Sequence, residues 1–154
     1  VATKGTEQDK VDFAGFAGAW GQMIEEHHDI EETDVFPEIN ELTGMPGLMD
    51  ANVEEHRVFH DGLSSFTAYI EKVKKGEEAL DGDKLRGIID AFMPSLPDPL
   101  DHEITTLLEL EKYSDKCDWA AWFTKKGGEI ASKGMKSSKY RVSSDAGWGE
   151  LLEP

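Results

Sequence analysis

Residues 13–36 read FAGFAGAWGQMIEEHHDIEETDVF, and their apolar side chains recur every three or four positions. This spacing is the period of an α-helix, so side chains that share it lie on one helix face. The apolar residues of that face are Phe13, Ala17, Trp20 and Ile24. His28 and Glu32 continue the same face, which predicts a helix that carries a histidine and a carboxylate into the interior. Pro37 predicts a kink or a restart at the end of this helix.

A second stretch, from about Met49 to Lys75, repeats the pattern and includes two histidines. His56 and His60 stand four residues apart on a stripe of apolar residues, so both would point in the direction of that stripe. Gly76 follows directly and is a typical residue for ending a helix. The sequence therefore predicts two helices that each bring a pair of ionisable side chains to the core.

Helical spacing returns after Leu85 and again between Pro99 and Tyr113. Asp98 would cap the last of these helices, with Pro99 in its first turn. The alternation of apolar and polar residues that is typical of β-strands is almost missing. These features predict an all-α fold, most simply an up-down four-helix bundle.

The C-terminal part differs in composition from the rest of the chain. We therefore predict a helical domain over residues 1–115 and an appended segment over residues 116–154. In this segment, a short helix at about residues 118–123 would end at Gly127-Gly128. The stretch of residues 132–154 is rich in Ser, Gly and Lys, and we expect it to be extended and to pack on the bundle.

The chain has 154 residues and a net charge of −16. Such acidity disfavours nucleic acids and anionic membranes as partners, since both attract positive charge. No run of about 18 apolar residues occurs, so no transmembrane helix is expected, and no secretory signal is recognisable. Cys117 is the only cysteine, which argues against disulfides and multi-cysteine metal sites and suits the reducing cytoplasm.

Ionisable pairs on two neighbouring helices are costly to bury. Each costs several kcal/mol unless it is hydrogen-bonded or bound to a cation. Imidazole and carboxylate together suit iron, manganese or zinc, and helix bundles build metal sites from side chains on facing helices. The pairs His28–Glu32 and His56–His60 therefore predict a metal site. The alternative is a polar core in which these side chains are hydrogen-bonded to one another.

The chain resembles a known family in three motifs. Residues 27–32, HHDIEE, and the dipeptide FP that follows are similar to the HHxxEE…FP signature of hemerythrin-like HHE cation-binding domains. Residues 56–60, HRVFH, resemble the HxxxH motif of that family. Residues 101–108, DHEITTLL, resemble its last motif, as fungal-type members have it. The resemblance extends over about residues 9–113 and, more loosely, into the tail.

The resemblance implies a four-helix bundle with two non-heme irons, which two carboxylates and an oxygen species bridge. Members of the family bind dioxygen, sense iron or oxygen, or handle iron stress. The matched ligand positions are His28, Glu32, His56, His60 and Glu103. Glu32 and Glu103 match the bridging carboxylates. His27 and Glu31 lie about 100° around the helix from that ligand face, which predicts surface or supporting roles for both.

Two departures from the family pattern affect the site. The family's first helix carries a histidine ligand, but no histidine precedes His27, so the chain would lack that helix. Pro99 stands where the family has a histidine four residues before Glu103, and proline binds no metal. His102 is adjacent to Glu103 but faces another direction on a regular helix. The five matched residues suffice for one metal, whereas a complete two-metal centre has less support.

Three interpretations of function follow. The first is a hemerythrin-like protein that binds iron for oxygen binding, iron handling or sensing, with dioxygen as its ligand. The second is a family member that has lost its metal and serves as a helical structural or interaction protein. The third is a mononuclear metalloenzyme that uses three histidines and a carboxylate. The pattern favours binding over catalysis, and it leaves the oligomeric state open.

Overall fold

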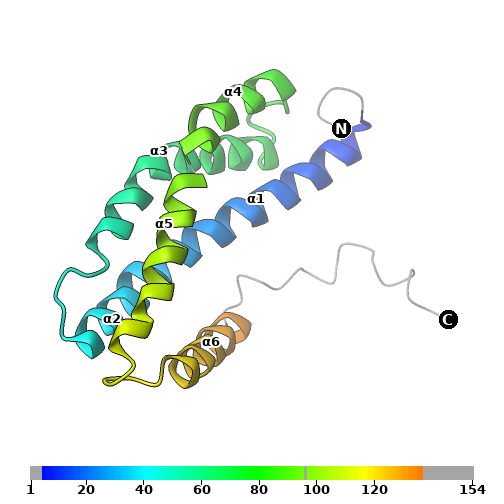
Figure 1. Cartoon of the computed structure of the whole chain (residues 1–154). Helices are drawn as coiled ribbons and strands as arrows, with labels where there is room; N and C mark the ends of the chain where they lie inside the picture. The colour runs from blue at the N-terminus through cyan, green and yellow to red at the C-terminus, as the bar shows by residue number, and fades with distance from the viewer. Residues whose placement is uncertain (1–4, 96, 137–154) are drawn as a thin grey trace. The chain divides into compact units, whose positions relative to one another are not determined.

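A computed structural model describes residues 5–95 and 97–136 (Figure 1). The longer helices are α1 (Glu7–Ile30), α2 (Phe36–Thr43), α3 (Asp50–Lys74), α4 (Gly82–Phe92), α5 (Pro97–Leu108) and α6 (Trp119–Lys136). The short segments are a π-helical turn (Glu31–Val35) and two 3-10 turns (Met93–Ser95 and Glu109–Tyr113). No strand occurs in the described part of the chain. The predicted all-α fold is confirmed.

Helix α1 begins at a capping box. The Thr6 side chain accepts a hydrogen bond from the Asp9 backbone, and the Asp9 side chain accepts one from the backbone of Thr6. The buried residues of α1 are all small: Ala14, Ala17, Gly18 and Gly21. A Cβ on Gly21 would lie 3.0 Å from Oγ1 of Thr67 on α3. Small residues therefore let α1 approach α3 closely.

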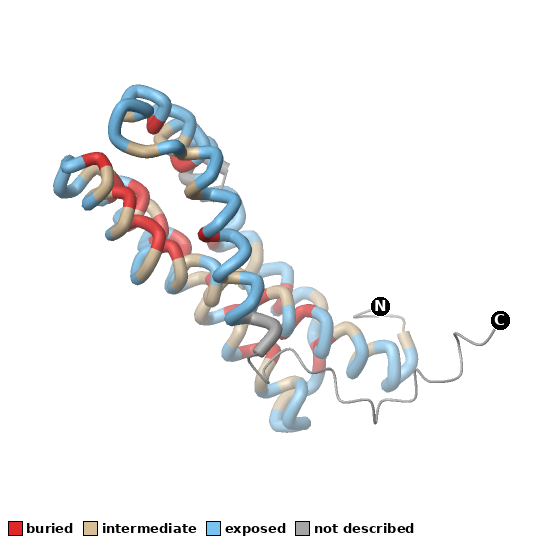
Figure 2. Tube along the Cα trace, turned by 90° about the horizontal axis from the view of Figure 1, so that it is seen from below, coloured by how far each residue is buried: buried red, intermediate tan, exposed pale blue. Residues whose placement is uncertain are grey.

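Helix α3 is the centre of this part of the molecule, because it packs against α1, α4 and α5. Gly44 ends α2 in the left-handed region, with φ of 67°, and the loop returns the chain so that α3 runs back beside α1 (Figure 1). The largest side chains that α3 buries are Phe59, Leu63, Phe66, Tyr69 and Ile70. Figure 2 shows the buried positions along the inner sides of the helices. The core thus forms around one central helix.

The π-helical turn Glu31–Val35 joins α1 to α2. The backbone N–H of Phe36 donates to the carbonyl of Glu31, five residues back. Pro37 follows in the first turn of α2, where a regular α-helix would bring its ring against the carbonyl of Thr33. The predicted restart at Pro37 is therefore confirmed. The irregular turn contains both Glu31 and Glu32, and such turns are frequent at functional sites.

Contacts within the chain divide it into two compact units, Val1–Lys116 and Cys117–Pro154. In the second unit, α6 runs for 18 residues and passes through Gly127-Gly128. The prediction that these glycines end a short helix is wrong, because a glycine costs a helix about 1 kcal/mol relative to alanine but does not forbid it. Residues 132–136, predicted to be extended, belong to α6. The remaining tail, residues 137–154, lies outside the described residues.

Helix α5 starts at Pro97, two residues before its predicted start at Pro99. The side chains of residues 95–99 lie outside the described part. No helix within the described ranges combines the length and apolar character that a membrane span requires.

Candidate metal centre

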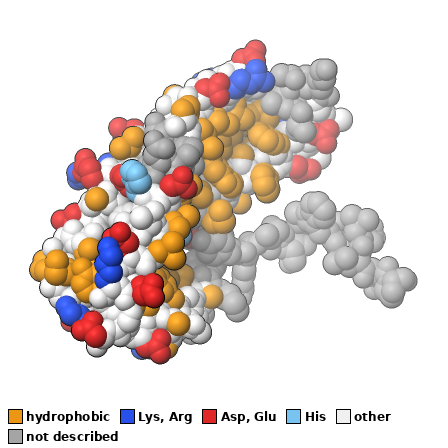
Figure 3. All heavy atoms as spheres, viewed as in Figure 1, with side chains coloured by type: hydrophobic (Ala, Val, Ile, Leu, Met, Phe, Trp, Pro, Cys, Tyr) orange, Lys and Arg blue, Asp and Glu red, His pale blue; other side chains and the backbone are white. Residues whose placement is uncertain are grey.

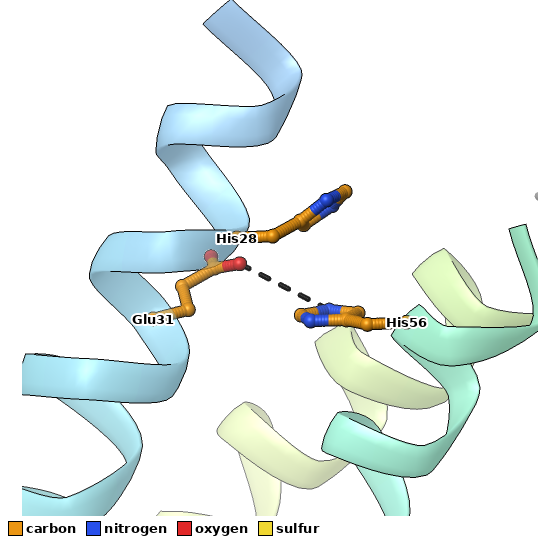
Figure 4. Close-up of side chains that lie close together, drawn as sticks. All are labelled: His28, Glu31 and His56. Carbon is orange, nitrogen blue, oxygen red and sulfur yellow. Dashed lines mark ion pairs between the residues drawn. The ribbon is translucent and has the colours of Figure 1, made fainter. Parts of the chain in front are cut away.

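Ionisable side chains from three elements meet at one interior point. His28 comes from α1, Glu31 from the π-helical turn and His56 from α3 (Figure 4). One ligand atom from each lies within 4.8 Å of the other two. Glu103 of α5 joins this cluster, with its Oε2 3.7 Å from Nε2 of His56. The structure therefore brings together His28, His56 and Glu103, as expected, and adds Glu31.

Glu31 is the residue that the sequence analysis missed. Its side chain is 11% exposed, whereas the side chain of Glu32 is 36% exposed, so the prediction of a surface position for Glu31 is wrong. That prediction considered only the helix face shared with His28. Glu31 lies to one side of that face, where Glu103 covers it. The signal in the sequence is the spacing of His27 and Glu31, which repeats the four-residue step of the predicted pair.

His56 has carboxylates around both ring nitrogens. Its Nδ1 lies 2.9 Å from Oε1 of Glu32, which is a hydrogen-bond distance. Its Nε2 lies 3.7 Å from Oε2 of Glu103 and 4.0 Å from Oε2 of Glu31. When the proton is on Nδ1 and is donated to Glu32, Nε2 keeps a free lone pair inside the cluster. A carboxylate on the outer nitrogen is the usual way to orient a metal-binding histidine.

The two oxygens of Glu31 have different surroundings. Oε1 lies 3.0 Å from Nε2 of His27, on the outer side. Oε2 is buried and has no hydrogen-bond partner among the described residues. A buried polar atom without a partner costs free energy, and a bound cation would remove that cost. Figure 4 shows this carboxylate directed towards the ring of His56.

The cluster shifts the pKa values of its members. Burial raises the pKa of Glu31 to about 8, and the negative charge of Glu103 adds to this effect. The contact with His56 lowers the pKa of Glu103. Burial and the neighbouring His56 lower the pKa of His28 to about 4. At neutral pH, His28 is therefore ready to bind a cation, whereas Glu31 must first release a proton.

The pKa of His56 also depends on burial and on the neighbouring carboxylates. Burial opposes its protonation, but the contacts with Glu103 and Glu32 outweigh burial and raise the pKa of His56. A cation that binds Nε2 would therefore compete with a proton held by the surrounding carboxylates.

The remaining predicted ligands, Glu32 and His60, lie beside the cluster. The His60 side chain is 70% exposed and ion-paired with Asp61 at 3.8 Å, so the expectation that it shares the interior point of His56 is not met. A step of four residues turns about 40° beyond a full helical turn, and this offset carries His60 out of the core. An adjoining cavity of about 250 Å³ is lined by Glu32 and His60, together with His28 and His56.

His102 lies outside the cluster. Its Nδ1 is 2.6 Å from Oε1 of Glu55, and its side chain is 65% exposed. This agrees with the prediction that His102 has a solvent-facing or supporting position rather than a place among the ligands.

The donor atoms of the cluster fit one transition-metal ion. Nitrogen and oxygen ligands lie about 2.0–2.2 Å from such an ion, which places any two of them at most about 4.4 Å apart. The atoms of His28, Glu31 and His56 lie within 4.8 Å of one another, so small side-chain rotations would complete the coordination. Two imidazoles and a carboxylate form the donor set that suits non-heme iron(II) and leaves open positions.

Part of the chain is similar to known proteins. The model of the hemerythrin HHE cation-binding domain matches residues 1–96, which ends directly before α5 and Glu103. A similar curated protein is "Dimeric xanthone biosynthesis cluster protein R11" of Cryptosporiopsis sp. (strain 8999), 36% identical over 90 residues. The match covers 58% of this chain and 34% of that relative, so the chain spans about a third of its length. No solved structure matches the chain. The chain belongs to the hemerythrin HHE cation-binding domain family.

Proposed function

We propose that the protein binds one iron(II) ion through His28, Glu31 and His56, with Glu103 as a fourth donor. One observation carries this proposal: Oε2 of Glu31 is buried without a hydrogen-bond partner in the described part of the chain, and it lies 4.0 Å from Nε2 of His56. Oε2 of Glu31 thus faces Nε2 of His56, which pairs with Glu103 when no ion is bound, across one small space. A divalent cation satisfies both.

Two further residues position these ligands. His27 holds Oε1 of Glu31 at 3.0 Å, and Glu32 holds Nδ1 of His56 at 2.9 Å. Each leaves the inner atom of its partner free for the ion. We therefore assign Glu32 to the support of His56 rather than to the metal, and loss of such support typically weakens metal binding by about 10–100-fold.

The role of the site is the binding of a small molecule such as dioxygen, in oxygen binding, iron handling or sensing. Iron, when bound, supplies a redox-active Lewis acid with open coordination positions. The adjoining cavity of about 250 Å³, beside His28 and His56, admits a small molecule to that position.

The sharpest test compares two neighbouring glutamates of identical chemistry. The metal-free protein is titrated with iron(II) under anaerobic conditions, and the iron retained is measured by elemental analysis. We expect one iron per chain in the unchanged protein, little or none in Glu31→Gln, and one weakly bound iron in Glu32→Gln. His56→Ala should lose the metal, whereas His60→Ala should keep it.

Other results would contradict the proposal in distinct ways. Iron lost in Glu32→Gln and kept in Glu31→Gln would restore the ligand set that the family motif implies. Two irons per chain would require a second position in the adjoining cavity. No metal in the unchanged protein would favour a metal-free helical protein, in which Glu32 and Glu103 close the cluster by pairing with His56.

A further inference from the structure

A second concave site lies between α1, α3 and α4, away from the metal centre. Its cavity of about 300 Å³ is lined mainly by five aromatic rings and one methionine: Phe13, Phe16, Trp20, Phe66, Phe92 and Met93. We call it the aromatic pocket. Figure 3 shows the hydrophobic side chains gathered around the part of the molecule where α1 and α4 lie.

The aromatic pocket has a buried floor and an open mouth. Phe66 and Phe92 form the floor and are 3% and 4% exposed. The rings of Trp20 and Phe66 meet edge to face, with centroids 5.4 Å apart and planes at 85°. Phe16 at the mouth is 72% exposed. The pocket is therefore held in shape by packed rings while its outer rim faces water.

The side chains that line the aromatic pocket limit which ligands it can bind. Among the described residues, no charged side chain lines it, and the lining residues that carry a polar side-chain atom are Trp20 and Met93. A ligand that placed a negative charge there would lose hydration without gaining a partner, and no carboxylate among the described lining residues pairs with a buried cation. The net charge of −16 also repels anions and a second copy of the same chain. The surroundings select an uncharged ligand that aromatic edges and faces can contact.

The volume sets the size of that ligand. A dry apolar cavity of about 150 Å³ holds one benzene molecule, and the aromatic pocket is about 300 Å³. We propose that this pocket binds an uncharged, planar aromatic molecule of two or three fused rings. Such a molecule covers Phe16 and lies against the ring of Trp20. Large exposed apolar surfaces on soluble proteins commonly mark binding sites of this kind.

This site is independent of the metal centre. Trp20 and His28 are eight residues apart on one helix, which corresponds to about 12 Å along its axis. A ligand in the aromatic pocket therefore does not touch the cation ligands, and its binding can be measured on the metal-free chain. Failure of iron binding leaves this proposal standing, and the reverse is also true.

The test uses an uncharged naphthalene dye, 6-propionyl-2-(dimethylamino)naphthalene, titrated into the full chain. We expect saturable binding of one dye per chain, with blue-shifted emission and energy transfer from tryptophan. Phe16→Asp should weaken binding by about tenfold or more, because a carboxylate then stands at the mouth. Leu108→Asp is the matched control, since Leu108 is also 72% exposed but lies on α5. It should leave binding unchanged.

A second variant locates the dye. Trp20→Phe keeps an aromatic ring, so it should retain binding and lose the part of the energy transfer that comes from Trp20. Transfer that survives Trp20→Phe undiminished, or equal affinity in Phe16→Asp and the unchanged protein, would overturn the proposal. Equally tight binding of the anionic dye 1-anilinonaphthalene-8-sulfonate would also overturn it. So would a dimer that Phe16→Asp dissociates, because a second copy would then cover the pocket.

Discussion

The two longest helices, α1 with 24 residues and α3 with 25, bury opposite kinds of side chain. Helix α3 buries large residues such as Phe59, Phe66 and Ile70, whereas α1 buries only alanines and glycines. Three large apolar residues of α1, Phe13, Phe16 and Trp20, instead line the aromatic pocket, and the C-terminal end of α1 carries His28 to the candidate metal centre. This difference indicates that α3 contributes larger apolar side chains to the core, whereas α1 carries residues of both proposed binding sites.

The largest expected effect tests this contrast with one phenylalanine on each helix. Phe66 of α3 is 3% exposed and Phe16 of α1 is 72% exposed. Phe66→Ala removes a ring from a packed core and should lower the free energy of unfolding by about 3–5 kcal/mol. Phe16→Ala should change it by about 0.5 kcal/mol or less. Urea denaturation of both variants measures the difference, and equal losses would remove the distinction between the helices.

Two glycines extend the test to backbone packing. A Cβ on Gly62 of α3 would collide with the Cβ of Phe92 on α4, whereas a Cβ on Gly15 of α1 would meet nothing. Gly62→Ala should therefore destabilise the protein by about 1–3 kcal/mol. Gly15→Ala should stabilise it by up to about 1 kcal/mol, because alanine is the better helix former. Thermal unfolding followed by circular dichroism reports both, and a stabilising Gly62→Ala would show that α4 does not pack there.

The polar end of α1 should make stability depend on pH. The pKa of Glu31 is raised from 4.5 to about 8 in the folded protein, so its stabilising contribution is complete below pH 4.5 and is lost as the pH rises through 8. The pKa of His28 is lowered from 6.5 to about 4, so its contribution is lost as the pH falls below 6.5. The two effects oppose each other between pH 4.5 and 6.5, and above 6.5 the loss from Glu31 continues without opposition from His28.

The metal-free protein should therefore lose stability between pH 6.5 and 8.5, as measured by urea denaturation at fixed ionic strength. The raised pKa of His56 acts in the same direction. Glu31→Gln removes the contribution of the carboxyl group, so its decline should be clearly shallower. Identical profiles for the variant and the unchanged protein would mean that Glu31 is not buried as a protonated acid.

Much of this arrangement is readable from the sequence, because helices that face a core repeat apolar residues at their own period. That period places His28 and His56 in the interior, where the structure has them together. The helical period does not predict that Glu31 is buried in the cluster. Which glutamate is buried depends on where α5 lies, and no local sequence pattern contains that information. The period also wrongly predicts an interior position for His60, because a step of four residues turns about 40° beyond a full helical turn.

The smallest expected effect concerns how the two helices begin. Thr6 caps α1 through a capping box, whereas α3 follows Met49, which makes no side-chain capping bond. Thr6→Ala should cost about 1 kcal/mol, and because the first turn of α1 is exposed, the cost should appear as local fraying. We expect faster hydrogen exchange at the first amides of α1 with little change in global unfolding, and Thr6→Ser should restore protection because it keeps the hydroxyl. If Thr6→Ala lowered global stability by the full amount, the start of α1 would belong to the cooperative core, and the division of roles between α1 and α3 would have to be abandoned.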